Sequence, residues 1–319
     1  MAKARPKRGP LSICRSGSLI SQVVLKHRSS EATLEVRTLA GEVLLSHELL
    51  QAPASHQLLG DGRSVLLAVL APSDDDADAD YALYRLDMEA GEQRLVGRAS
   101  DHQVAVAEDR LACFRRSCLT VKTLEGSDIF SIPMPDDDGH RALAFLPDGR
   151  LAVSARAAAN GAPVDVVILN GETGAIEVRC ESQAASVYDR FAPGVFAVDP
   201  RGEFLVLAGY YSGLVIFDLA SGANVAARFA PHPLDLAEGH VATHDHHHYA
   251  SVAFDEGGRF MAATYRPGWV SLWTRNGEVV LREAPFVNPK GERLIAFDDS
   301  DLVYFDSMGD VARFALPPG

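Results

Sequence analysis

The feature that most constrains the fold of this chain is an internal repeat about 45 residues long. Each copy contains four short apolar segments separated by a turn rich in Asp and Gly, a variable loop and a second turn that contains Gly. The clearest copy begins at Val195, and Gly222 lies in its last turn. The equivalents of this glycine along the chain are Gly41, Gly91, Gly126, Gly174, Gly222, Gly277 and Gly309. Their mean spacing fits a four-stranded blade of roughly 40 to 50 residues.

Seven such copies predict an all-β protein, a seven-bladed β-propeller of four-stranded antiparallel blades. One blade cannot cover both of its faces, whereas seven blades around an axis bury every face. The predicted blades span residues 11–50, 54–98, 100–133, 140–180, 187–232, 241–283 and 286–316, after a basic flexible tail at 1–10. Small residues recur in the predicted inner strands at Ala105, Ala144, Ala197 and Ala253.

The ends of the repeat predict how the ring closes. The first strand begins near Leu11 and the last ends near Leu316, so no strand is exchanged between the first and last blades. Closure is therefore expected to depend on side-chain packing. In blade seven the first strand is reduced to residues 286–288, between two prolines.

Short motifs add a family resemblance to this periodicity. Two third strands end in Phe217-Asp218 and Phe305-Asp306, and Gly139-His140 and Gly239-His240 precede two first strands. These pairs resemble the Trp-Asp and Gly-His signatures of the WD40 repeat proteins. The resemblance covers the whole chain in periodicity, with few signature residues, and implies a degenerate WD40-like propeller.

Charge and composition narrow the classes of partner. The net charge is −13, which disfavours nucleic acid and anionic membranes and suits a basic partner, a cation or simple solubility. No run approaches the 18 apolar residues of a membrane span, and no apolar segment of a signal peptide follows the basic N-terminus. A cytoplasmic location is therefore expected. Sparse cysteines agree with a reduced state, although Cys113 and Cys118 flank a turn across which they could face each other.

The two ends of the predicted blades differ in their connections. The turns joining strands one and two, and three and four, are uniformly short, and their Asp residues suit turn chemistry. We call the end that carries them the turn face. The other end, the loop face, carries the long insertions at 73–80, 136–138, 157–163, 182–194 and 230–249. Binding residues concentrate on variable loops held by a rigid scaffold, so the loop face is the candidate functional surface, unless its insertions are merely tolerated.

Aromatic residues on the loop face predict a protein-binding patch, because Tyr and Trp are enriched at binding hot spots. The patch comprises Tyr188, Phe191, Tyr210, Tyr211, Tyr249, Tyr265 and Trp269. Some of these residues could instead cover the blade ends as core. The sequence thus favours a non-enzymatic scaffold that binds another protein, within a multi-protein assembly.

Histidines supply the alternative function. His244, His246 and His248 alternate, so in an extended segment they would share one side and could hold a divalent transition metal at the channel mouth. That reading implies a metal-dependent hydrolase or oxidoreductase. The competing readings are a solvated or partner-facing loop and a contact surface switched by protonation. The aspartate run within 73–80 could bind calcium or a basic partner, but its like charges are typical of a solvated loop.

Overall fold

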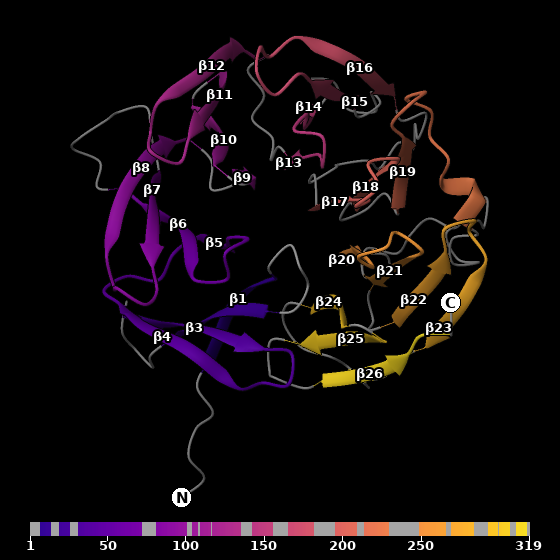
Figure 1. Ribbon diagram of the computed structural model, residues 1–319, viewed down its shortest axis with the longest axis horizontal. Helices are drawn as coiled ribbons and strands as arrows, with labels where there is room; N and C mark the ends of the chain where they lie inside the picture. Colours follow the sequence, from indigo (N-terminus) through magenta and orange to yellow (C-terminus); the bar gives the residue numbers. More distant parts are fainter. Residues whose placement is uncertain are drawn as a thin grey trace, which may run out of the picture.

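The computed structural model describes most of the chain apart from its connecting segments. The described residues are 7–13, 19–25, 31–71, 81–100, 104–107, 109–115, 117–134, 142–155, 165–181, 195–208, 214–229, 249–265, 269–283, 293–298, 300–306 and 311–317. They form seven separate antiparallel sheets arranged as a ring (Figure 1). The predicted all-β, seven-bladed propeller is confirmed.

The first four blades each have four strands, and neighbouring strands in the chain are neighbours in the sheet. Blade one contains β1 (Lys7–Ile13), β2 (Leu19–Leu25), β3 (Ala32–Thr38) and β4 (Val43–Leu49). Blade two contains β5 (Ser55–Leu58), β6 (Ser64–Leu70), β7 (Tyr81–Asp87) and β8 (Gln93–Ala99). Blade three contains β9 (Val104–Ala107), β10 (Arg110–Arg115), β11 (Cys118–Thr123) and β12 (Asp128–Pro133). Blade four contains β13 (Leu143–Phe145), β14 (Leu151–Ala155), β15 (Asp165–Leu169) and β16 (Ile176–Glu181).

The last three blades are less uniform. Blade five contains β17 (Val195–Val198), β18 (Phe204–Ala208) and β19 (Leu214–Asp218), followed by a 3-10 helix, η1 (Ala226–Phe229). Blade six contains β20 (Tyr249–Phe254), β21 (Phe260–Tyr265), β22 (Trp269–Thr274) and β23 (Val279–Glu283). Blade seven contains β24 (Arg293–Asp298), β25 (Asp301–Asp306) and β26 (Val311–Ala315).

The first strand of each blade lies next to the central axis and the last lies on the outer rim (Figure 1). The four predicted inner-strand alanines all fall in first strands, namely β9, β13, β17 and β20. At the start of the chain, β1 begins at Lys7 rather than near Leu11, so residues 7–10, predicted as tail, belong to blade one.

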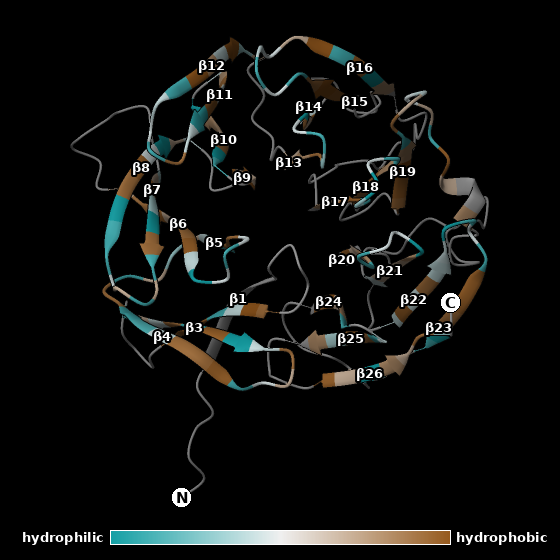
Figure 2. Cartoon of the chain, in the orientation of Figure 1, coloured by the Kyte–Doolittle hydropathy of each residue, from teal (hydrophilic) through white to brown (hydrophobic). Residues whose placement is uncertain are grey.

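The core consists of apolar layers between adjacent blades. Successive residues of a strand point to opposite faces of the sheet, so a middle strand must be apolar throughout. Leu205 of β18 packs towards blade four, whereas Val206 packs towards blade six. Outer strands have one exposed face and carry both hydrophilic and hydrophobic residues (Figure 2). The continuous apolar segments of the repeat are thus middle strands buried on both faces.

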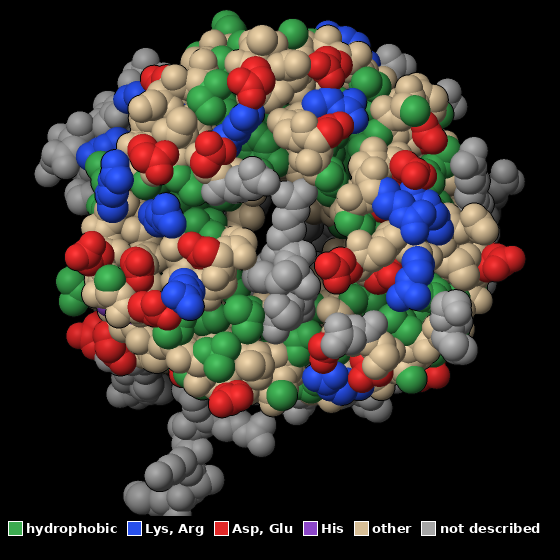
Figure 3. Space-filling model, in the orientation of Figure 1, with side chains coloured by type: hydrophobic (Ala, Val, Ile, Leu, Met, Phe, Trp, Pro, Cys, Tyr) green, Lys and Arg blue, Asp and Glu red, His purple; other side chains and the backbone are tan. Residues whose placement is uncertain are grey.

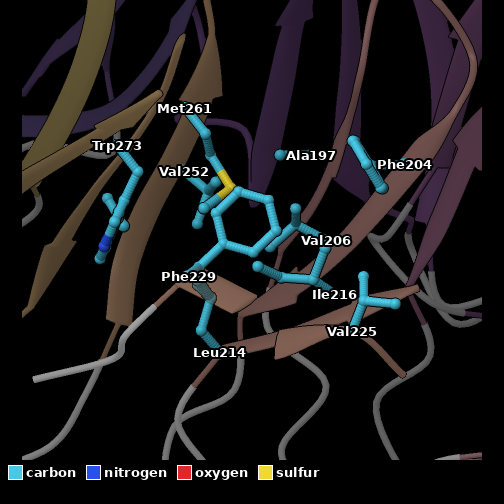
Figure 4. Close-up of a cluster of buried hydrophobic side chains, with 11 residues drawn as sticks. Ala197, Phe204, Val206, Leu214, Ile216, Val225, Phe229, Val252, Met261 and Trp273 are labelled. Carbon is cyan, nitrogen blue, oxygen red and sulfur yellow. The ribbon is translucent and has the colours of Figure 1, made fainter. Parts of the chain in front are cut away.

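Blade five departs from the predicted pattern after its third strand. Residues 224–229 were expected to form a fourth strand, but only an isolated bridge joins Asn224 to Phe217 before η1 begins. Phe229 of η1 instead enters the layer between blades five and six, beside Met261 and Val206 (Figure 4). Its ring lies 6.0 Å from that of Phe204, edge to face at 87°. The short helix therefore fills the space with one aromatic side chain.

Blade seven differs from the prediction in which of its strands is the first. β24 lies against the inner strand β20 of blade six, and the Ile295 N–H donates to Ser251 Oγ across this junction. β24 is therefore the first strand, and the predicted first strand at 286–288 lies outside the described residues. Leu316 N–H donates to Ser300 O, as Leu219 N–H after the third strand of blade five donates to Glu203 O. β26 is consequently the third strand, not the fourth.

This strand assignment corrects two sequence interpretations. Phe305-Asp306 ends β25, which is a second strand and not a third one, and the glycine series also changes. Gly309 lies between β25 and β26, in the connection between the second and third strands, and does not match the other six glycines. The repeat is weak in blade seven, and its three strands fit equally well as strands one to three or as strands two to four of a blade. The prediction used the second assignment, which is wrong. Within the described part of the chain, blade seven has no fourth strand.

Among the described strands, none is exchanged between the first and last blades, in agreement with the prediction. β1 pairs with β2 inside blade one, and blade seven contains β24, β25 and β26. A small apolar cluster joins the two blades, formed by Ile20, Leu39, Ala296, Val303 and Phe305. Arg313 of β26 also donates a 3.5 Å hydrogen bond to Leu39 O of blade one.

Candidate functional site

The turn face is built from tight turns that need glycine or a side-chain acceptor. Every described glycine with positive φ lies in a turn between strands one and two or between strands three and four of its blade. Asp218 is typical of the acidic residues here, because its carboxylate accepts the N–H groups of Ala220 and Ser221. Asp61 accepts from Arg63 and Ser64 in the same way. These carboxylates stabilise turns, which agrees with the sequence interpretation.

At the opposite end of blade six, three aromatic residues occupy neighbouring positions. Tyr249 of β20 lies opposite Tyr265 of β21, and Tyr265 lies opposite Trp269 of β22. We call these residues the aromatic row. They come from the beginning of one strand, the end of the next and the beginning of the third, all at the loop face. The structure thus brings together three of the seven residues predicted as a patch.

Trp269 connects the aromatic row to the core. Its side chain is half-buried and packs against the apolar cluster between blades five and six. Part of the indole is therefore core, as the alternative interpretation of the aromatic residues expected, and part reaches the surface. A half-buried indole is fixed in position by its packing, which suits an anchor because little side-chain entropy remains to be lost on binding.

The other predicted site residues lie outside the described residues. They are the partner-binding candidates Tyr188, Phe191, Tyr210 and Tyr211, and the metal-ligand candidates His244, His246 and His248. The five long insertions of the loop face also fall wholly or almost wholly outside. Among the described ranges, no group of three or more His, Cys, Asp or Glu side chains is arranged to hold a metal ion.

An ionic cluster on the turn face joins blades five and six and was not predicted from sequence. The Arg275 guanidinium donates to the buried Asp199 carboxylate at 3.0 Å and also pairs with Glu203. It stacks 4.9 Å from the centre of the Phe204 ring. Burial opposes the charge on Arg275, but the hydrogen bonds that it donates to its two carboxylate partners raise its pKa above the usual value. No local motif marks these residues, because they are 72 and 76 positions from Arg275.

This ionic cluster is one part of a mixed surface. Lys and Arg side chains lie beside Asp and Glu side chains over one face of the ring (Figure 3). Several of these pairs join neighbouring blades, such as Arg110 with Glu172 at 2.6 Å. Charges paired in this way hold blades together and leave little net field for a strongly charged ligand.

His56 is a half-buried histidine in the inner strand of blade two, and its Nδ1 atom is shielded from solvent. Its Nε2–H donates to Ser21 O of blade one at 3.2 Å, and Nδ1 has no hydrogen-bond partner in the structure. Burial lowers the pKa of His56 to about 4, although the hydrogen bond to Ser21 partly offsets that effect. The ring is therefore neutral at pH 7 and acts as a structural residue.

The cysteines of blade three do not form a pair. Cys113 lies opposite Thr120, and Cys118 lies opposite Arg115, so the possibility that the two thiols face each other across the hairpin is wrong. Both are free. Burial raises the pKa of Cys113 to about 11, which leaves it a protonated, unreactive core residue.

The described residues contain no helix with the length and apolar character needed to cross a membrane. No protein-family model matches the chain, and no curated protein matches it.

Solved structures do match it. Hsv2 from Kluyveromyces marxianus superposes with a TM-score of 0.68 at 11% identity, covering 97% of this chain and 92% of that one. Hsv2 from Kluyveromyces lactis gives 0.66 at 9% identity, covering 97% and 93%. Similarity at such low identity is evidence of fold alone. The comparisons and the seven sheets together show that this chain has the architecture of a seven-bladed β-propeller.

Proposed function

We propose that this propeller is a non-enzymatic scaffold that binds a partner protein through the loop face, with the aromatic row as anchor. The observation that carries the proposal is the register of blade six, where Tyr249, Tyr265 and Trp269 occupy consecutive positions across three strands. Aromatic residues contribute large contact areas for little loss of side-chain entropy and dominate many protein interfaces.

The predicted Tyr210 and Tyr211 extend this argument to blade five. They belong to the connection between β18 and β19, which is equivalent to the connection between β21 and β22 that Tyr265 and Trp269 flank. Two adjacent blades therefore carry aromatic residues at or next to the same connection. A patch that spans two blades suits a folded partner better than a small ligand.

The charge of the chain defines the partner further. With a net charge of −13, the scaffold attracts basic partners and repels nucleic acid. The proposed setting is a multi-protein assembly in the cytoplasm, in which the aromatic row provides the central contact and the acidic loops provide the rim.

The test is a comparison of variants in affinity capture from the native cell. Tyr265→Ser removes the central member of the aromatic row, and we expect the dominant captured protein to fall at least about tenfold, as for a hot spot worth 1.4 kcal/mol or more. Val279→Ser is the matched control, because Val279 is an exposed apolar residue at the turn face of the same blade. Equal capture by wild type and Tyr265→Ser would contradict the proposal.

Elemental analysis of untagged protein distinguishes the scaffold proposal from the alternative of a metal-dependent enzyme. The scaffold proposal predicts no stoichiometric transition metal. Metal at close to one equivalent, lost in a triple variant of His244, His246 and His248, would support the alternative metal-dependent enzyme.

A further inference from the structure

Outer strands have a second role in this ring besides completing their own sheets. Each places alternate apolar side chains in the layer shared with the next blade. Phe130 and Ile132 of β12 pack against blade four, and Val178 and Cys180 of β16 pack against blade five. β4, β8 and β23 contribute to the following layers in the same way. The fourth strand therefore seals the junction that follows its blade.

The outer strands also support the turn between strands three and four of the next blade. Gly174 of blade four lies over Phe130 of β12, and Gly222 of blade five lies over Arg179 O of β16. Gly126 of blade three lies over Val96 O of β8. In each case a Cβ added to the glycine would meet an atom of the preceding fourth strand within 4 Å.

Blade seven lacks both features among the described residues. Gly41 is the equivalent glycine in blade one, and a Cβ added there would meet nothing within 4 Å. The cluster between blades seven and one contains residues of β2, β24 and β25 with Leu39, and none from a fourth strand. Counted over the described residues, it is the smallest of the seven apolar clusters.

The third strand of blade seven is consequently an edge strand. Val311 of β26 is 47% exposed. Buried and exposed side chains alternate along β26, as they do in the outer strands β4 and β12. The third strands β19 and β22 of blades five and six are instead buried almost throughout. In an antiparallel edge strand every second residue directs its N–H and C=O away from the sheet. Such an edge can pair with an added strand.

We infer that the edge of β26, which pairs with no strand among the described residues, accepts an extended segment of a partner polypeptide as the fourth strand of blade seven. The segment would run antiparallel to β26, as β12 runs antiparallel to β11. It would need apolar side chains at alternate positions to cover the exposed Val311 and to extend the cluster that contains Phe305 and Leu39, with polar residues between them facing solvent. This surface is separate from the aromatic row of blade six.

Self-association is disfavoured at this edge by charge. Arg313 is the central residue of β26. Antiparallel pairing of two β26 strands about their centre places two arginines directly opposite each other, which is destabilising in a sheet. A partner segment with uncharged residues at that position avoids the repulsion.

The experiment uses amide hydrogen exchange of the full chain with a synthetic peptide as probe. The peptide carries the sequence of β12, Asp128–Pro133, which already has the chemistry of a fourth strand in this ring. The control peptide has Ser in place of Ile129, Phe130 and Ile132. At ten times its Kd, the first peptide should slow exchange of the outward amides within 311–315 about tenfold, and the control should not.

Three results would overturn the inference. One is no slowing with either peptide, and another is equal slowing with both. The third is an edge already protected in the free protein as strongly as the β11 amides, since the chain itself or a second copy would then occupy it.

Discussion

Blades five and seven each lack a regular fourth strand in the described structure, but they compensate for it differently. In blade five, Val225 and then Phe229 of η1 follow β19 and enter the layer with blade six. In blade seven no described residue takes that place, and the layer with blade one is the smallest. A missing strand therefore need not leave a gap, provided that one large side chain is delivered to the same space.

The comparison separates two functions of an outer strand, namely pairing with the third strand and filling the junction. Blade five keeps the second function and loses most of the first. Blade seven has neither among its described residues, so the junction between blades seven and one should be the weakest in the ring. The predictions that follow test this difference.

The largest effect is expected from truncating Phe229, the aromatic side chain that fills the layer between blades five and six. Phe229→Ala leaves a cavity between blades five and six and should lower the free energy of unfolding by about 3–5 kcal/mol. Phe305→Ala is the matched variant at the junction between blades seven and one, where the apolar cluster is smaller, and it should cost about 2–3 kcal/mol. Denaturant unfolding measures both values. Equal losses would show that the two junctions are packed alike.

A pH titration tests the junction between blades one and two, whose apolar cluster has more described residues than the cluster between blades seven and one. His56 has a pKa of about 4 in the folded state against 6.5 in the unfolded state. The stability that its neutral form contributes is complete above pH 6.5 and is lost as the pH falls from 6.5 to 4. The expected loss is about 3 kcal/mol, measured as the free energy of unfolding at each pH.

His56→Gln supplies the control for that titration. Glutamine keeps a donor for Ser21 O but does not titrate, so the variant should lose the pH dependence between 4 and 6.5. A variant with the same slope as the wild type would assign the effect to other groups.

An ion pair that crosses the junction between blades five and six can be compared with one that lies within blade seven. Arg275→Met leaves the buried Asp199 without its charged partner and should cost about 2–3 kcal/mol, below the full value for a buried pair because Asp199 keeps backbone hydrogen bonds. Arg313→Met removes a more exposed pair with Asp298 and Asp301 and should cost less than about 1 kcal/mol. Unfolding at low and high salt distinguishes them, because only the exposed pairs are strongly screened.

Much of the fold was predictable because backbone requirements recur in the repeat. Glycines such as Gly126 and Gly174 adopt positive φ in the turns, and the middle strands are apolar throughout because both of their faces are buried. Blade five was harder to predict, since residues 224–229 have a strand-like composition but fold as η1. The strands of blade seven were assigned wrongly because Gly309 fits the spacing of the turn glycines, although it lies in the connection between β25 and β26.

The candidate site was less predictable. Tyr249, Tyr265 and Trp269 were selected for their residue type, and only the register shows that they are neighbours. The ionic cluster around Arg275 carried no sequence signal, because its partners come from another blade. Contacts between blades depend on side chains far apart in the chain, whereas turns depend on residues that are adjacent.

The smallest effect, at single turn glycines, tests most directly whether an outer strand precedes blade one. Gly41→Ala and Gly222→Ala both place a Cβ at positive φ, of 89° and 71°, at a cost of about 1 kcal/mol each. At Gly222 the new Cβ would also lie 2.5 Å from Arg179 O, which should add about 1 kcal/mol or more. At Gly41 it meets no atom within 4 Å, so only the backbone strain remains. If the two substitutions cost the same in denaturant unfolding, then either the Gly222 turn moves freely away from β16 or an unseen strand supports Gly41. Adding the β12 peptide decides between these, because occupation of the β26 edge should increase the cost of Gly41→Ala and leave that of Gly222→Ala unchanged.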